Sequence, residues 1–350
     1  MDVEILFERR GAAGLVTLNR PQALNAVTHG MVGALAAKLA EWAADAAVTR
    51  VVVTAAGNRA FSAGGDLRAL YDLVRNERHK EALAFWRDEY VLNAMIKHYR
   101  KPYVAIIDGI VMGGGVGISV HGSHRVAGDH FQFAMPEAGI GFFPDVGATW
   151  FLPRMPGELG TYCALTGDRL ATPDAVAAGI ATHHVGSTRI VDLVEALCGT
   201  VSVDAVLAAF AESATSGPLT ARRRVIDRVF NAPRVEDILD VLERDAASGR
   251  RDAEWAGITA ATIRAKSPLS LKIALTQMRR GKTLNFNECM VTEFRIVSRL
   301  VHGHDFYEGV RALIVDKDNA PHWQPPTLAA VAEAEVDRHF APLANELELP

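Results

Sequence analysis

Gly113-Gly114-Gly115-Val116-Gly117 is the stretch on which the fold of this chain depends, because it closely follows the apolar run Tyr103-Val104-Ala105-Ile106-Ile107. Glycine has no Cβ, so such a run lets the backbone approach a ligand and leaves the N–H groups at a helix start free to bind it. The stretch therefore predicts a buried strand, a turn and a helix start that together stabilise an anion.

Two carboxylates follow this glycine run. They are Glu137, in Met135-Pro136-Glu137, and Asp145, in Phe143-Pro144-Asp145-Val146-Gly147. A neighbouring proline stiffens each loop. Either acid alone would also fit an ordinary surface carboxylate, but two acids behind an anion-binding backbone favour a site for carbonyl chemistry.

Other functions of a glycine-rich loop fit this sequence less well. A dinucleotide-binding loop would need a third glycine where Ile118 stands, and Gly281-Lys282-Thr283 lacks the first glycine of a phosphate loop because Thr276 takes its place. The G-x-S-x-G pattern of a serine hydrolase is missing around Ser62, Ser119 and Ser123. Close helix–strand packing stays open as a purely structural reading of the run.

Composition describes an ordinary globular protein. The chain has 350 residues, of which 49% are hydrophobic and 22% charged, with a net charge of −4. This charge offers no general attraction for nucleic acid or for an anionic membrane. No apolar run approaches the roughly 20 residues of a membrane span.

The cysteines and the first residues bear on location. Cys163, Cys198 and Cys289 are widely spaced, which favours buried free thiols over disulfides or a zinc site. Residues 1–10 are strand-like and carry acidic residues, unlike a signal or transit peptide. The cytoplasm is the expected location.

Periodicity predicts an α/β core followed by helices. Strands are expected at residues 3–7, 15–18, 50–54, 103–107, 125–127 and 131–134, with helices at 81–98 and behind the N-cap Thr28. The last third reads as helical, at residues 201–210, 235–247, 253–265, 269–279 and 287–301. We expect a core over residues 1–200 and a helical region over 201–350.

Several longer motifs carry a family resemblance. Asn19-Arg20-Pro21, Phe61-Ser62-Ala63-Gly64-Gly65-Asp66-Leu67, residues 109–117 and Met135-Pro136-Glu137 resemble the crotonase, or enoyl-CoA hydratase/isomerase, superfamily. Residues 116–122, 143–147, 303–311 and 316–318 are most similar to its 3-hydroxyisobutyryl-CoA hydrolase family. The resemblance implies a spiral of ββα units with a helical C-terminal region that packs over the active site, where Asp305 and Arg311 would tie that region to the core.

The resemblance also implies roles for the loop residues. The backbone N–H groups of Ala63 and Gly114 would form the oxyanion hole, and the Ala63-Gly64-Gly65-Asp66 loop would hold the adenine end of coenzyme A. Asp66 also fits a helix N-cap, and both roles can hold together.

Four further positions acquire roles in the same way. Glu137 matches the superfamily's catalytic acid or base, Asp145 a second acid, and Glu89 a substrate-contacting glutamate. Gly117 stands where hydratases carry their second catalytic glutamate, which argues against hydration and would leave room in the pocket.

The expected function is hydrolysis of a small 3-hydroxyacyl-CoA thioester, 3-hydroxyisobutyryl-CoA in valine breakdown. An enoyl-CoA hydratase or dienoyl-CoA isomerase is the alternative, and a non-catalytic acyl-CoA- or RNA-binding homologue is an alternative of another class. No metal or redox cofactor is expected, and the histidines, paired along the sequence, fit hydrogen-bonded side chains better than metal ligands. The family also allows a homo-oligomer, such as the trimer of many crotonases.

Overall fold

The computed structural model describes residues 3–350, so residues 1–2 of the strand-like start lie outside the described part. The strands form two sheets. One has six strands in the order β1-β2-β3-β5-β7-β10, with bounds Ile5–Arg10, Ala13–Leu18, Arg50–Ala55, Tyr103–Ile107, His124–Ala127 and His183–His184. The other has the order β4-β6-β8-β9, with bounds Ala60–Ser62, Ile110–Met112, Gln132–Ala134 and Leu170–Ala171.

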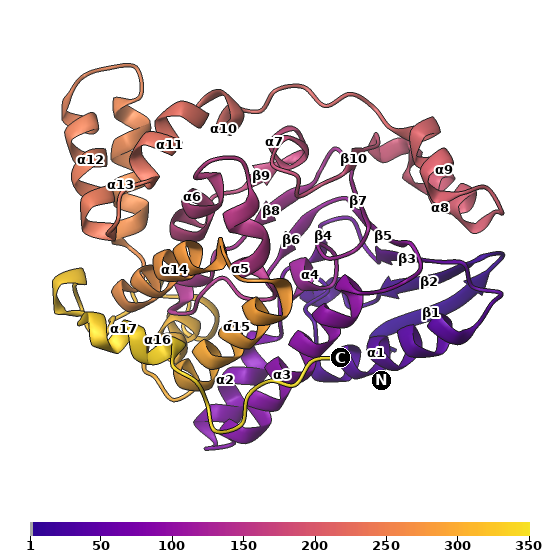
Figure 1. Ribbon diagram of the computed structural model, residues 1–350, viewed down its shortest axis with the longest axis horizontal. Coiled ribbons are helices and arrows are strands. Elements are labelled where there is room, and N and C mark those ends of the chain that lie inside the picture. The colour runs from indigo at the N-terminus through magenta and orange to yellow at the C-terminus, as the bar shows by residue number, and fades with distance from the viewer. Residues whose placement is uncertain (1–2) are drawn as a thin grey trace.

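The chain winds between the two sheets as a spiral. β3, β5 and β7 run parallel in the larger sheet, and each is followed at once by β4, β6 or β8 in the smaller one. Helices follow β4 and β6 before the chain returns to the larger sheet (Figure 1). The predicted spiral of ββα units is therefore confirmed.

The helices of the first 200 residues cover the sheets. Their bounds are α1 His29–Ala44, α2 Leu67–Arg75, α3 His79–Lys97, α4 Gly114–Gly117, α5 Ala148–Phe151, α6 Leu159–Thr166, α7 Thr172–Ala177 and α8 Ile190–Cys198. The expected N-cap of α1 is confirmed, because Thr28 accepts a hydrogen bond from the N–H of Met31.

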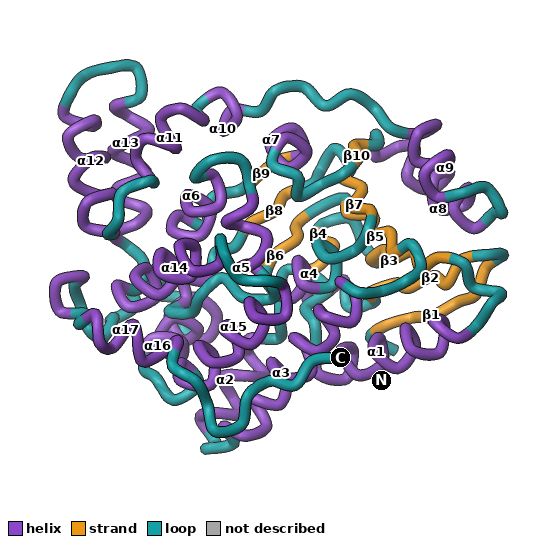
Figure 2. Tube along the Cα trace, viewed as in Figure 1, coloured by secondary structure: helices purple, strands orange, loops and turns teal. Residues whose placement is uncertain are grey.

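Beyond residue 200 the described chain is helical, as the sequence predicts (Figure 2). The helices are α9 Val203–Phe210, α10 Pro218–Ala221, α11 Arg223–Phe230, α12 Val235–Ala247, α13 Ala253–Arg264, α14 Pro268–Gly281, α15 Phe286–Leu300, α16 Asp305–Val310 and α17 Glu333–Phe340. α10, α11, α16 and α17 have no counterpart in the sequence prediction. All four have only four to eight residues, which is too short for a clear helical period.

Successive side chains of the larger sheet point to opposite faces, and each face packs against its own apolar cluster. Val52, Val104 and Val126 face one way and pack against Leu193 of α8 and Leu207 of α9. Residues of opposite parity join the main core, which reaches from β1 to the C-terminal helices. α9 therefore packs on the sheet although it lies beyond residue 200, and the domain boundary at that residue stays a prediction.

Three further predictions from the sequence can be compared directly with the structure. The three cysteines are free and buried, as predicted. The turn between the first two strands consists of Gly11 and Ala12, and the first strand starts at Ile5, two residues later than expected. Within residues 3–350, no helix combines the length and the apolar character needed to cross a bilayer.

Candidate active site

A cavity of about 380 Å³ brings most of the predicted site residues together. It lies between α3, the start of α4, and the loops that carry the two acids. Its polar side chains are Glu89, Glu137, Asp145 and Lys266, whereas Phe85, Trp86, Ile140 and Phe142 provide much of its apolar wall. Glycine backbone from residues 64–65 and 113–114 completes it. A small acyl group is of suitable size for such a cavity.

The oxyanion hole predicted from Ala63 and Gly114 needs one correction. The N–H of Ala63 is already used, since it donates to the carbonyl of Leu24 at 3.0 Å. The next residues form a parallel bridge with Val27, which takes up the carbonyl of Gly64 and the N–H of Asp66. The N–H of Gly65 therefore points away from Val27.

Gly65 is the residue whose amide faces the glycine turn. Its nitrogen lies 3.4 Å from the position that a Cβ on Gly114 would take. Gly114 is the first residue of α4, so its own N–H has no intrahelical partner. Two backbone donors, Gly65 and Gly114, thus converge on one side of the cavity and can hold a carbonyl oxygen that gains negative charge.

Asp66 does not line the cavity. Its side chain caps α2 by accepting the N–H of Ala69 at 3.2 Å, which confirms the N-cap reading. The same carboxylate pairs with Arg20 at 3.1 Å. The first interaction fixes the end of this loop to the first turn of α2, and the second ties it to Arg20; contact of Asp66 with coenzyme A stays a prediction.

Glu89 lies in the cavity because α3 presents it on the same face as Phe85 and Trp86. Its Oε1 is buried without a hydrogen-bond partner, and a Cβ on Gly114 would lie only 2.4 Å from it. Burial raises the pKa of Glu89 well above its ordinary value, and the nearby Asp145 adds to the rise. Oε1 of Glu89 can therefore accept a hydrogen bond from the hydroxyl group of a ligand.

Glu137 begins a short helical turn directly after Pro136. It is buried, and its Oε2 has no hydrogen-bond partner. Burial raises its pKa well above the ordinary value, Asp145 reinforces the rise, and Lys266 opposes it. A carboxyl with an unpartnered oxygen on the wall of a cavity can act as a base or as a nucleophile.

Asp145 is held by its neighbour in α3. Tyr90 donates its hydroxyl to Oδ2 of Asp145 at 2.9 Å. Burial raises the pKa of Asp145 to about 7, while the Tyr90 bond favours the charged form and opposes the rise. The cavity therefore contains a second acid, Asp145, close to Glu137, and its charge changes near neutral pH.

Gly117 does not leave room in the pocket, contrary to the sequence expectation. A Cβ at this position would lie 2.8 Å from both the side-chain amide of Asn93 and the Cβ of Val146. The space beside Gly117 is filled, and the residue does not line the cavity. The negative part of the prediction stands, because no acid occupies this position.

The C-terminal region closes one side of the cavity. Lys266, Leu313 and Ile314 line it, and the ring of Phe306 packs at 5.8 Å from Trp86 and 5.0 Å from Phe142. Glycine permits this close packing, since a Cβ at Gly309 would lie 2.4 Å from the backbone of Ile140. Helices after residue 265 therefore shape the site.

Asp305 and Arg311 do not tie this region to the core through their side chains, which corrects the sequence expectation. Asp305 accepts hydrogen bonds from Ser267 at 2.6 Å and from the N–H of Gln324 at 2.8 Å. Arg311 pairs with Glu308, Asp316 and Asp318. Both side chains hold the C-terminal region to itself.

The predicted role of the histidines is confirmed for those that form hydrogen bonds. His121 binds the carbonyl of Val146 at 2.7 Å, and His124 and His184 pair with Asp204 and Asp129. Over residues 3–350, no group of three or more His, Cys, Asp or Glu side chains is arranged to hold a metal ion.

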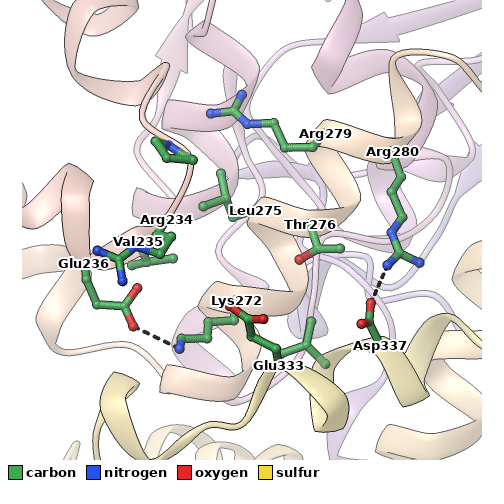
Figure 3. Close-up of a pocket in the computed structure, with 12 residues that line it drawn as sticks. Arg234, Val235, Glu236, Lys272, Leu275, Thr276, Arg279, Arg280, Glu333 and Asp337 are labelled. Carbon is green, nitrogen blue, oxygen red and sulfur yellow. Dashed lines mark hydrogen bonds and ion pairs between the residues drawn. The ribbon is translucent and has the colours of Figure 1, made fainter.

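A second hollow, of about 310 Å³, lies between α12, α14 and α17 (Figure 3). Its cations are already paired: Lys272 with Glu236, Arg280 with Asp337, Arg279 with Glu158 and Arg234 with Asp237. It contains none of the glycine amides described above, so it has no counterpart of the oxyanion-binding geometry.

Comparison with known proteins places this geometry in context. The sequence model of the enoyl-CoA hydratase/isomerase family matches residues 13–340. Curated relatives include proteins named mitochondrial 3-hydroxyisobutyryl-CoA hydrolase. The one from Danio rerio is 43% identical over 97% of this chain and 90% of its own length, and that from Homo sapiens is 40% identical over 98% and 89%.

Two solved structures are similar along the whole chain. One, named a carnitinyl-CoA dehydratase from Mycobacterium thermoresistibile, has a TM-score of 0.93 at 43% identity and covers 99% of both chains. Another, named an enoyl-CoA hydratase from Rhodobacter sphaeroides, has a TM-score of 0.92 at 37% identity and covers 99% of this chain and 100% of its own.

Proposed function

The chain belongs to the enoyl-CoA hydratase/isomerase family, and from this premise we propose that it hydrolyses the thioester of 3-hydroxyisobutyryl-CoA, as the names of its curated relatives indicate. The observation that carries the proposal is that one cavity is lined by two backbone donors, Gly65 and Gly114, and by the unpartnered carboxyl of Glu137. Donors aimed at a carbonyl oxygen lower the barrier to attack at its carbon, typically by several kcal/mol.

The chemistry can follow one of two routes that start from the same geometry. In the first, Glu137 attacks the thioester carbon and the C–S bond breaks, so that an anhydride forms and coenzyme A leaves as a thiolate that takes a proton. Water then hydrolyses the anhydride and restores Glu137. In the second, Glu137 removes a proton from a water molecule that attacks the carbon directly. Both routes consume one water and yield 3-hydroxyisobutyrate and free coenzyme A.

The other two acids have separate tasks in this proposal. Glu89 accepts a hydrogen bond from the 3-hydroxyl group, which would satisfy its buried and unpartnered Oε1. Asp145, held by Tyr90, positions the water or the acyl hydroxyl. The proposal invokes no metal ion or redox cofactor, and coenzyme A enters as part of the substrate.

Hydration or dehydration of an enoyl-CoA is the rival function, and the names of the two similar solved structures favour it. Gly117 speaks against it. Glycine at this position cannot provide a second acid, and Asn93 and Val146 fill the adjacent space. A dienoyl-CoA isomerase remains the alternative that uses Glu137 and Asp145 to move protons. A non-catalytic acyl-CoA- or RNA-binding role is disfavoured by the two acids in one cavity and by the net charge of −4.

A panel of acyl-CoA esters tests the proposal. Release of free thiol from 3-hydroxyisobutyryl-CoA, measured by a colorimetric thiol assay, should be faster than hydration of crotonyl-CoA, measured by loss of enoyl absorbance. The Glu137→Gln variant, assayed alongside, should lose the thiol release. Hydratase turnover equal to or above the thioesterase turnover would show that the rival function is correct.

We also propose a pathway, a cellular location and an oligomeric state for the protein. A role in valine catabolism follows from the proposed substrate. The cytoplasm remains the proposed location on the sequence argument, although the relatives are named mitochondrial, and cell fractionation would decide between them. A homo-oligomer such as a trimer is proposed because many crotonases form one. Light scattering during size-exclusion chromatography would measure the mass of the assembly.

A further inference from the structure

The loop that carries Asp145 has an unfavourable backbone conformation. Val146 has φ of 51° and Gly147 has φ of 90°, so two consecutive residues after Asp145 lie in the left-handed region. A β-branched residue such as valine rarely adopts this conformation, and it persists where surrounding contacts enforce it. The position of Asp145 therefore depends on groups outside the loop.

Glu293 of α15 provides the first of these groups. Its Oε2 accepts the N–H of Gly147 at 2.7 Å, and its Oε1 accepts the N–H of Thr149 at 2.8 Å. Glu293 is fully buried, and burial raises its pKa to about 8. One carboxyl thus uses both oxygens to fix the backbone two and four residues after Asp145.

Two further side chains bind the loop from other directions. Gln277 of α14 donates to the carbonyl of Pro144 at 2.5 Å and to the hydroxyl of Thr149 at 2.6 Å. His121 binds the carbonyl of Val146 at 2.7 Å. His121 is fully buried and burial lowers its pKa to about 3, so the ring is neutral and its Nε2–H is the donor.

We propose that Glu293 is a positioning residue, which acts with Gln277 and His121 to hold Asp145 in its catalytic orientation toward the cavity. We call these three side chains the loop clamp. The clamp reaches residues 144, 146, 147 and 149, on both sides of Asp145, and makes no contact with the cavity itself. The inference rests on the proposed function, because it assigns a support to one of its acids.

The proximity of like charges strengthens the assignment. The charge of Asp145 disfavours the ionised form of Glu293, and the charges of Asp145 and Glu293 both raise the pKa of Glu89. A buried acid that serves only to fill space would be replaced by an apolar side chain at lower cost. Glu293 instead uses both carboxyl oxygens to accept N–H bonds from one loop, which is the arrangement expected of a residue that fixes geometry.

A double-mutant cycle tests the clamp. Glu293→Gln exchanges one acceptor oxygen for an amide that cannot accept, so one backbone N–H loses its partner. We expect kcat for 3-hydroxyisobutyryl-CoA to fall about ten- to hundredfold, as small misplacements of catalytic groups do, with KM changed less than about twofold. In an Asp145→Asn background the same substitution should change kcat less than about twofold, because the group it positions is already lost. Equal losses in both backgrounds, or an unchanged kcat in the first, would overturn the proposal.

Two controls separate the clamp from general stability and from the proposed function. Glu236→Gln removes a charge from α12, where Glu236 pairs with Lys272 away from the loop, and should leave kcat unchanged. A crystal structure of Glu293→Gln gives a readout that needs no turnover. We expect Val146 to leave the left-handed region and the Asp145 carboxyl to separate from the Tyr90 hydroxyl. An unchanged loop would refute the clamp, whereas absent thioesterase activity in the wild type would refute only the proposed function.

Discussion

The carboxyl of Glu89 occupies the space in which a side chain on Gly114 would begin, because a Cβ there would lie 2.4 Å from Oε1. The glycine thus serves two purposes. Its N–H is free to serve the proposed oxyanion site, and its lack of a side chain admits an acid from α3 beside it. The close packing expected of the glycine run is therefore confirmed, and its role in binding an anion stays a prediction.

Gly114→Ala should therefore displace Glu89 and disturb the oxyanion donors together. We expect kcat/KM for the acyl-CoA substrate to fall at least about a hundredfold, the scale of a lost oxyanion donor. Gly33→Ala is the matched control, since Gly33 lies in α1 with no atom within 4 Å of the added methyl group. It should leave activity unchanged and stabilise the helix slightly. Similar activity in the two variants would contradict the prediction.

Glu137→Gln should lower kcat at least about a hundredfold, as expected when a catalytic carboxylate is lost. The wild-type rate should also depend on pH. Glu137 reacts in its charged form, and burial raises its pKa, so kcat/KM should increase with pH above the range in which an exposed glutamate titrates. Near-normal turnover in Glu137→Gln would mean that another residue performs the attack.

Stability should decrease as the pH rises. Burial raises the pKa of Asp145 from 3.8 to about 7 and that of Glu293 from 4.5 to about 8, so the folded protein favours their neutral forms. Their contribution to the free energy of unfolding is fully present below about pH 4 and is lost as the pH rises through these values. The melting temperature should fall between pH 5 and pH 9.

Asp145→Asn should flatten this dependence, raising the melting temperature at pH 8 by about 2 °C or more relative to the wild type. Asp240→Asn, an exposed change on α12, should leave the wild-type dependence in place. Differential scanning calorimetry across the pH range measures both. A melting temperature that is constant or rises toward pH 9 would contradict the sign of the buried-carboxyl effect.

Gly117→Glu should not create a hydratase. The added side chain would meet Asn93 and Val146 at 2.8 Å, so we expect a protein destabilised by about 1–3 kcal/mol, as for other overpacked cores. Crotonyl-CoA hydration should stay at the wild-type level. Clear gain of hydration would show that the space beside Gly117 opens more easily than its packing indicates.

Removal of residues from Ser267 onward should abolish thioester hydrolysis. The truncation deletes Phe306, Leu313 and Ile314 from around the cavity and exposes the apolar surface they cover, so solubility should also fall. The single change Phe306→Ala tests the same contact in the full-length chain and should lower kcat with the fold retained. A soluble truncation with full activity would exclude a role for the C-terminal region as a cover.

The sequence predicts which loops line the cavity, but it does not identify every backbone N–H that is free to bind a ligand there. The motif of residues 61–67 identifies the loop beside the cavity, yet the free amide belongs to Gly65 and not to Ala63. The choice depends on the bridge to Val27 and on the carbonyl of Leu24, which lie about forty residues earlier and leave no mark in the motif itself. The local motif predicts which loop lies beside the cavity. Pairing with residues distant in the sequence determines which N–H of that loop stays without a backbone partner.

Residues that would act through other residues leave a weaker signal in the sequence. Tyr90, Gln277 and Glu293 occupy helices, where a polar side chain normally indicates a solvated face. Glu293 sits among Met290, Phe294 and Val297 on a buried stripe, and this local mismatch is the signal that could have singled it out. Its partner could not be read from the sequence, because the loop at Gly147 is 146 residues away.

The same separation has a consequence for how the enzyme matures. Synthesis proceeds from the N-terminus, so the ribosome delivers Glu137 and Asp145 well before α14 and α15 exist. Until those helices dock, the loop after Asp145 lacks the bonds to Gln277 and Glu293 that enforce its backbone, and the cavity lacks one wall. Contacts of such sequence separation are slow to form, because a long loop of chain must close first. A chain that ends before α15 therefore lacks these supports, and we expect it to be inactive toward thioesters even though it already contains both acids.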